Sequence, residues 1–130
     1  MEQRVGIYKR EGTRSAPPLV DKEFRRVMVS IIGRCEWPGG CKSRHELDPA
    51  HIRAKGMGGG RCEDTPVNIM VLCRKHHMIY DHQMGQGPKN QEMMRRHTRK
   101  ARTKDEWRDI RREWTKRHPG LDAAGRRRRS

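Results

Sequence analysis

Three cysteines and one histidine have the types and the spacing of metal ligands. They form two pairs, Cys35 with Cys41 and Cys73 with His76. Zinc prefers four such soft or borderline ligands in a tetrahedron, and a Pro-Gly-Gly turn can fold the longer spacer of the first pair back on itself. The sequence therefore predicts a structural Zn²⁺ site in which protein fills all four coordination positions.

The fourth cysteine, Cys62, is an alternative ligand. It lies in a glycine-rich segment and could replace His76 in an all-cysteine site; otherwise it is a free buried cysteine. Disulfides are a less suitable use of these thiols, because the N-terminus lacks the apolar stretch of a secretory signal and intracellular thiols stay reduced. We therefore expect a cytoplasmic protein. No segment approaches the roughly 18 apolar residues of a membrane span, so no membrane partner is expected.

A second group of polar residues has a different chemistry. His77 and Asp81 are four residues apart, so they share one face of a predicted helix. An imidazole and a carboxylate can hold a divalent cation and leave positions open for phosphate and water, and this mixed donor set suits magnesium or manganese. The ordinary pKa of a histidine side chain also suits proton abstraction from water near neutral pH.

Charge and composition indicate the kind of partner. The chain has 130 residues, a net charge of +15 and a pI of about 10.7, and residues 83–130 contain 16 Lys/Arg against six Asp/Glu. Such an excess of positive charge favours a polyanion, most often nucleic acid. Because only 32% of residues are hydrophobic and 36% are charged, the core is small and a metal is a suitable staple for it.

Local signals predict an α+β fold. Asp21 is a suitable N-cap for a helix over 21–32, and the Thr103/Glu106 capping box begins another that ends before His118. The segments HELDPAHI and the short apolar run that follows Asn68 read as strands. Two further helices are predicted over about 73–83 and 88–101.

Three segments together resemble the HNH, or ββα-metal (His-Me finger), endonuclease motif. They are LDPAHIRAKGMGGG, DTPVN and LCRKHHMIYD, within about residues 35–82, and they are most like small phage and prophage HNH nucleases. The resemblance implies a zinc-stabilised ββα-metal core with flanking basic helices, and hydrolysis of DNA phosphodiester bonds with Mg²⁺ or Mn²⁺. It implies His51 as general base, Asn68 as the residue that orients its loop, His77 as a ligand of the catalytic cation and Asp81 as a further ligand.

One position departs from the family pattern. The residue before the base histidine is often Asp or His and binds the cation, whereas here it is Ala50. Asp48 lies two residues earlier, and His45 is a more distant candidate. Alternatively, phosphate oxygens, water and Asp81 complete the coordination shell.

Basic residues near these motifs are the expected DNA contacts. Phosphate contacts of this kind give affinity and register but little sequence specificity. The candidates are Arg53, Lys55, Arg95, Arg96, Arg99 and Lys100, with Arg102 and the Arg126–Arg129 tail as additions. Phage terminase or recombination proteins are possible partners by resemblance. The alternative function is a zinc-stabilised DNA-binding module without hydrolytic activity, which the alanine at position 50 favours.

The expected organisation has four parts. A flexible basic arm is predicted for residues 1–20 because that segment is rich in Gly, Ser and Pro. The nuclease core with its zinc occupies 21–84, a basic helical extension follows over 85–120, and an arginine-rich disordered tail covers 121–130.

Overall fold

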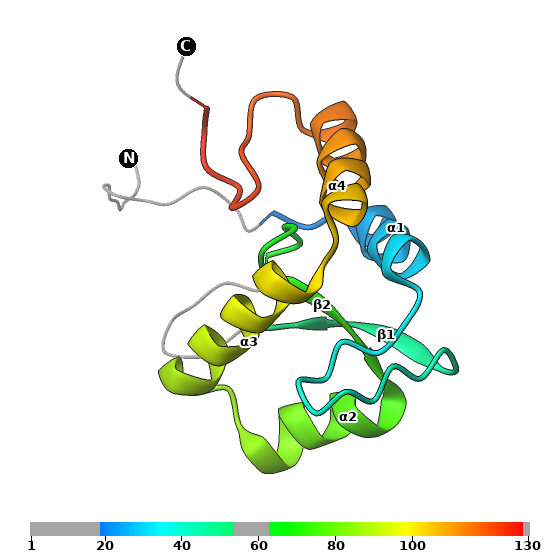
Figure 1. Ribbon diagram of the computed structural model, residues 1–130. Coiled ribbons are helices and arrows are strands. Elements are labelled where there is room, and N and C mark those ends of the chain that lie inside the picture. The colour runs from blue at the N-terminus through cyan, green and yellow to red at the C-terminus, as the bar shows by residue number, and fades with distance from the viewer. Residues whose placement is uncertain (1–18, 54–62, 129–130) are drawn as a thin grey trace, which may run out of the picture.

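The computed structural model describes residues 19–53 and 63–128 of the chain (Figure 1). Its elements in chain order are α1 (Lys22–Ile32), β1 (Leu47–His51), β2 (Ile69–Cys73), α2 (Arg74–Met78), the π-helix η2 (Ile79–Met84), α3 (Pro88–Ala101) and α4 (Lys104–Arg117). The fold is α+β, as predicted, and the helix α2 follows the second strand without a break. Cys62, Lys55 and most of the predicted N-terminal arm lie outside the described residues.

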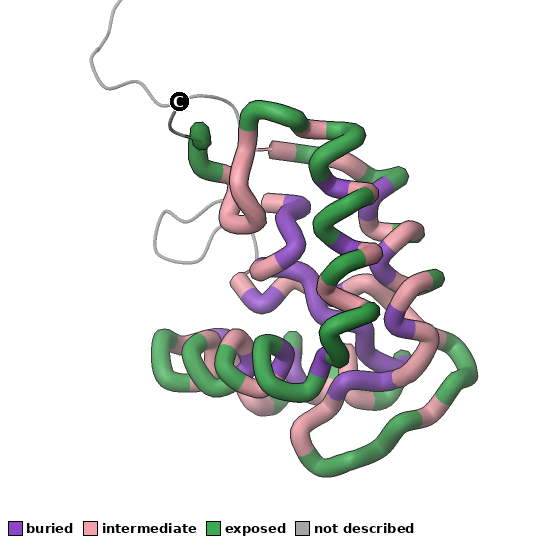
Figure 2. The backbone as a smooth tube through the Cα atoms, turned by 45° about the horizontal axis from the view of Figure 1, so that its top comes forward, coloured by how far each residue is buried: buried purple, intermediate pink, exposed green. Residues whose placement is uncertain are grey.

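The two strands form an antiparallel hairpin that divides the molecule into two layers. Leu47 pairs with Cys73 at one end and His51 with Ile69 at the other. All five residues of β2 are buried, and successive side chains of a strand point to opposite faces. The hairpin is therefore covered on both sides (Figure 1), and Figure 2 shows buried backbone at the centre with exposed residues on the outer turns of the helices.

One layer is the α1–α4 cluster. The members of this cluster from β2 are Ile69 and Val71, and the helices α1 and α4 pack over them. The rings of Phe24 and Trp114 meet edge to face with centroids 4.9 Å apart. Fully burying a side chain of this size contributes about 1.5–3 kcal/mol, so the predicted apolar faces of both helices are core.

The opposite layer is the α2–α3 cluster. Ala50 and Ile52 from the first strand region meet Met70 and Leu72 from the second, and Tyr80 and Met94 cover them. Burial raises the pKa of the Tyr80 phenol to about 12, and its hydroxyl donates a hydrogen bond to the carbonyl of Ile52 at 2.7 Å. This bond fixes the chain just after β1 against η2.

The helix ends follow the local signals in the sequence. The Asp21 side chain accepts a hydrogen bond from the backbone N–H of Phe24, and α1 ends at Gly33, whose φ of +62° favours glycine. Both hydrogen bonds of the Thr103/Glu106 capping box are present at the start of α4. The single helix predicted over 73–83 is α2 continued as a π-helix. In the described part of the chain, no helix combines the length and apolar character that a membrane crossing needs.

The C-terminal segment differs from the disorder predicted for residues 121–130. Leu121 and Arg127 form an isolated antiparallel bridge, and the indole N–H of Trp114 donates to the carbonyl of Asp122 at 2.9 Å. A buried indole needs an acceptor for its N–H, so the tail up to residue 128 is fixed by the core below it. Composition alone could not indicate this contact.

Candidate metal centre and candidate active site

The four predicted zinc ligands come together from two parts of the chain. Cys35 and Cys41 lie on the loop between α1 and β1, where Gly40 adopts a φ of +86°. Cys73 ends β2 and is the N-cap of α2, so the first turn of that helix brings His76 back beside it. The four ligand atoms all lie within 4.8 Å of one another.

The distances in this Cys₃His cluster fit a tetrahedral zinc. His76 Nδ1 lies 3.3 Å from Cys73 Sγ and 3.6 Å from Cys35 Sγ. Zn–N and Zn–S bonds of ordinary length at a tetrahedral angle place such atoms about 3.6 Å apart. The cluster could therefore bind a metal such as zinc, as predicted from the spacing.

The surroundings hold the cluster in a closed position. Cys35 and Cys73 are buried, and the indole of Trp37 stacks on the ring of His76 with centroids 4.7 Å apart and an interplanar angle of 8°. Burial raises the pKa of the Cys35 thiol to about 11. A cation must displace a proton from this thiol to bind, because the thiolate is the metal ligand.

His51, the predicted base, is oriented by a carboxylate that sequence reasoning did not single out. Its Nε2 lies 2.6 Å from Oδ1 of Asp64. The Asp64 side chain is fully buried, whereas that of His51 is 16% exposed. Nε2 is thus fixed, and within the described residues no hydrogen bond involves His51 Nδ1.

Asp64 is held in its ionised form by three donors. The Nε of Arg25 donates to it at 2.9 Å and the backbone N–H of Asp21 at 2.7 Å. Burial by itself raises the pKa of Asp64, but the hydrogen bonds from Arg25, His51 and the Asp21 backbone outweigh it and lower that pKa below its usual value. The only sequence signal was that Asp64 opens the DTPVN segment of the motif.

Asn68 fastens the chain on both sides of the segment 54–62. Its Oδ1 accepts a hydrogen bond from the backbone N–H of Arg53 at 3.0 Å. Its Nδ2 donates to the carbonyls of Arg53 at 3.2 Å and Glu63 at 2.9 Å. These bonds have the geometry expected of a residue that orients the chain next to His51.

His77 contacts two carboxylates through opposite edges of its ring. Nδ1 lies 3.1 Å from Asp48 Oδ2, and Nε2 lies 3.1 Å from Asp81 Oδ2. Gln86 Nε2 donates to the other oxygen of Asp81 at 2.7 Å. The three side chains therefore form a chain of contacts and do not converge on one point. In the described segments, the Cys₃His cluster is the one group of three or more such ligands that converges.

His51 and His77 belong to different faces of the hairpin. Asp48 and Ala50 face α2, and Ala50 is fully buried in the α2–α3 cluster. His51 points the other way, toward Asp64 and Arg25 of α1. No hydrogen bond or ion pair of the described residues joins His51 to His77 or Asp81, so the structure does not bring the predicted base and the predicted cation ligands into one group.

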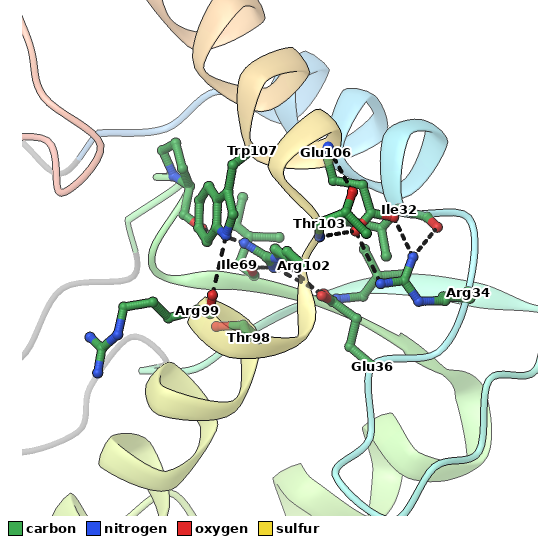
Figure 3. A network of polar contacts seen from close by, with 12 residues as sticks. Ile32, Arg34, Glu36, Ile69, Thr98, Arg99, Arg102, Thr103, Glu106 and Trp107 are labelled. Atoms are coloured by element: carbon green, nitrogen blue, oxygen red, sulfur yellow. Dashed lines mark hydrogen bonds and ion pairs between the residues drawn. The ribbon is translucent and has the colours of Figure 1, made fainter.

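Arg102 corrects the prediction of one continuous basic stretch. Its guanidinium is fully buried and pairs with Glu36 at 2.8 and 2.9 Å. It also donates to the carbonyls of Pro66 and Ile69 (Figure 3). Arg102 is therefore a core residue that is not available to DNA, because a long-range partner 66 positions away neutralises it.

The remaining basic residues of α3 lie on two faces. Arg95 and Arg99 line a cavity beside α4, whereas Arg96 and Lys100 line another beside the Pro38 turn. Residues four apart share a helix face and adjacent residues do not. The predicted DNA contacts on α3 therefore form two separate surfaces.

Comparisons of the chain with family models, with curated proteins and with solved structures gave no match. The structure establishes an α+β chain with a Cys₃His cluster that could bind a metal such as zinc. Any function beyond this is inferred from the residues and their geometry.

Proposed function

We propose that the protein is a metal-dependent HNH endonuclease that hydrolyses DNA phosphodiester bonds, with His51 as the general base. One observation carries the proposal: a buried carboxylate holds one nitrogen of the His51 ring, and no described residue makes a hydrogen bond to the other. A base fixed by a second residue is the arrangement that proton abstraction from water requires.

The chemistry of the pair follows from the hydrogen bond. The Asp64 carboxylate can only accept, so it holds the proton of the neutral imidazole on Nε2 of His51. The lone pair is then on Nδ1, where it can take a proton from a water that attacks phosphorus. Arg25 and the Asp21 N–H keep Asp64 in place, so the ring has one preferred orientation.

Asn68 and Arg53 extend this arrangement toward a phosphate. Arg53 is two residues after the base, and the Asn68 amide fixes both its backbone N–H and its carbonyl. A guanidinium at this position can bind two phosphate oxygens at once. Asn68 is therefore a positioning residue, which acts through Arg53 and His51.

The donors available for a divalent cation are two carboxylates and one imidazole beside α2. Mg²⁺ or Mn²⁺ would stabilise the charge on the phosphate, and Asp48, His77 and Asp81 have donor atoms that suit such ions. Their contacts run in a chain through the two edges of one ring, which is not a ready three-ligand site.

This same feature favours a second candidate, a zinc-stabilised DNA-binding module without hydrolytic activity. Ala50 occupies the position where a ligand is expected, and its side chain is fully buried. Without a converged cation site, the basic surfaces would bind DNA and the Cys₃His cluster would hold the fold.

Nicking of supercoiled plasmid separates the two candidates. With Mg²⁺ or Mn²⁺ present, wild type should nick, and His51→Ala should be slower by about 10²–10⁴-fold because the base is removed. His82→Ala is the matched control, since His82 is an exposed histidine on η2, and should leave the rate unchanged. DNA binding without nicking by wild type would establish the module, and equal nicking by His51→Ala would exclude His51 as the base.

A further inference from the structure

A cavity of about 340 Å³ lies between α3 and α4, on the side where Asn68 holds the chain. Three arginines line it, Arg95, Arg99 and Arg111, together with Trp107. Thr98 of α3, Val67, the neighbour of Asn68, and Ala123 of the C-terminal segment complete the lining. The backbones of Val67 and Ala123 are joined by a hydrogen bond of 3.4 Å. The volume is at the lower end of the range of about 300–1,000 Å³ found for small-molecule sites.

The three arginines differ from the other basic residues of α3 and α4. In the described chain, no carboxylate lies within ion-pair distance of Arg95, Arg99 or Arg111, whereas Arg96 pairs with Glu92 and Arg108 with Asp105. Three guanidinium groups around one cavity without a counter-charge favour an anionic occupant. Phosphate suits them best, because the planar guanidinium can donate to two of its oxygens.

The indole of Trp107 forms one wall of the cavity. The indole of Trp107 stands next to Arg99, whose side chain extends away from the buried Arg102–Glu36 pair (Figure 3). The Trp107 N–H donates to the carbonyl of Arg99 at 3.4 Å, and the guanidinium of Arg102 lies 4.9 Å from the ring centroid. The guanidinium of Arg111 lies over the same ring, 5.7 Å from its centroid. Main chain and two cations therefore hold the indole in place, and a flat group in the cavity would meet the indole together with the Arg111 guanidinium.

The cavity is also close to the candidate active site. Val67 precedes Asn68, the residue that fastens Arg53. Arg95 is near enough to Tyr80 to lower the pKa of that phenol against the larger effect of burial, and the Tyr80 hydroxyl bonds to the carbonyl next to Arg53. The cavity is therefore next in the chain to the Asn68 contacts that fix Arg53.

We infer that this cavity binds an unpaired nucleotide of the DNA substrate, with the arginines on its phosphate and the indole wall against its base or sugar. The inference deepens the proposed nuclease function and depends on it for the identity of the strand. In a regular duplex the bases are stacked inside, so a duplex offers phosphates to the arginines but no base face to the indole. An unpaired base exposes its flat face, and stacking of such a base on an aromatic ring contributes about 1–3 kcal/mol. The substrate class is therefore DNA with a single-stranded extension, flap or junction.

Binding of two DNA probes tests the inference. Anisotropy at one fixed salt concentration gives the Kd for a blunt duplex and for the same duplex with a short unpaired extension, using the His51→Ala protein so that neither probe is cut. We expect the extended probe to bind on the order of tenfold tighter. Arg99→Gln combined with Arg111→Gln should abolish this preference.

The matched control removes the same charge elsewhere. Arg96→Gln combined with Arg108→Gln also takes away two positive charges, from α3 and α4, but not from the cavity. It should weaken both probes in similar proportion, because counterion release does not depend on strand structure, and it should keep the preference. Val67→Trp fills the cavity without a change of charge and should also abolish the preference.

The outcomes separate this inference from the proposed function. A wild-type ratio of one between the probes overturns the nucleotide site, as does an equal effect of the two double variants on that ratio. Plasmid nicking decides the nuclease independently, because the binding assay uses a protein without the base. If the wild-type protein never nicks but prefers the extended probe, the nucleotide site is supported and the nuclease function is excluded.

Discussion

The two faces of the β1–β2 hairpin hold their polar groups in opposite ways. On the α2 face, four ligand atoms converge within 4.8 Å, and an indole covers one of them. On the α1 face, Asp64 is the centre from which hydrogen bonds spread to Arg25, to the Asp21 backbone and to His51. No described residue makes a hydrogen bond to the second nitrogen of the His51 ring. A converged set with all positions filled by protein can stabilise but has no place for a substrate. A spreading network that ends on a ring nitrogen can react.

The largest expected effect on folding stability comes from the Cys₃His cluster on the α2 face. Cys73→Ser should remove the zinc and with it most of the folding free energy, because metal binding contributes about 10–16 kcal/mol in small zinc domains. Metal content by mass spectrometry and the circular dichroism melting curve measure the loss. Cys62→Ser is the matched control and should keep one zinc per chain; loss of zinc in that variant, with zinc retained in His76→Ala, would establish the all-cysteine site instead.

A smaller effect is expected where the converged face is tied to α3 and α4. Arg102→Met leaves the Glu36 carboxylate buried without a partner and should lower the free energy of unfolding by about 3–5 kcal/mol. Urea denaturation measures it. Arg96→Met is the control, since the Arg96–Glu92 pair has 59% and 57% exposed side chains, and should cost less than about 1 kcal/mol. The double variant Glu36→Leu with Arg102→Met removes both charges. If it recovers most of the lost free energy of unfolding, the unpaired Glu36 charge is the cause.

On the α1 face, removing the charge of Asp64 should give the smallest loss of folding stability, and that loss should depend on pH. The pKa of Asp64 is lowered from its usual value of 3.8, so its stabilisation is fully present above that value and is lost as pH falls through the lower folded-state pKa. Asp64→Asn should therefore lower the free energy of unfolding by about 1.5–3 kcal/mol near neutral pH. The difference in free energy of unfolding between Asp64→Asn and wild type should become smaller below pH 3.8. Unfolding curves of both proteins from pH 7 downward test this. A difference in free energy of unfolding that increased in acid would contradict it.

Local signals predicted the elements because they act within one or two turns. The Asp21 cap, the Gly33 end and the Thr103/Glu106 box each involve residues next to each other in sequence, and each is present. The pairing of Cys73 with His76 was also local, and it predicted the cluster. The C-terminal segment and the π-helix were missed because side chains from other elements decide their paths.

The candidate site was predictable as residues but not as partners. Spacing singled out His51 and Asn68, yet Asp64 became visible only through its 2.6 Å contact with His51. Arg102 looked like its basic neighbours in sequence, and only the approach of Glu36 from the loop after α1 makes it a core residue. Such contacts depend on how distant segments cross, and no spacing rule describes them.

The clasp that Asn68 makes on both flanks of residues 54–62 has a practical consequence. Since one amide fixes Arg53 and Glu63 together, the chain is held at set points on both sides of these residues. Doubling the length of a loop between two fixed points costs only about 0.6 kcal/mol. This position is therefore a suitable acceptor for a grafted peptide, which an engineer could place two residues from His51.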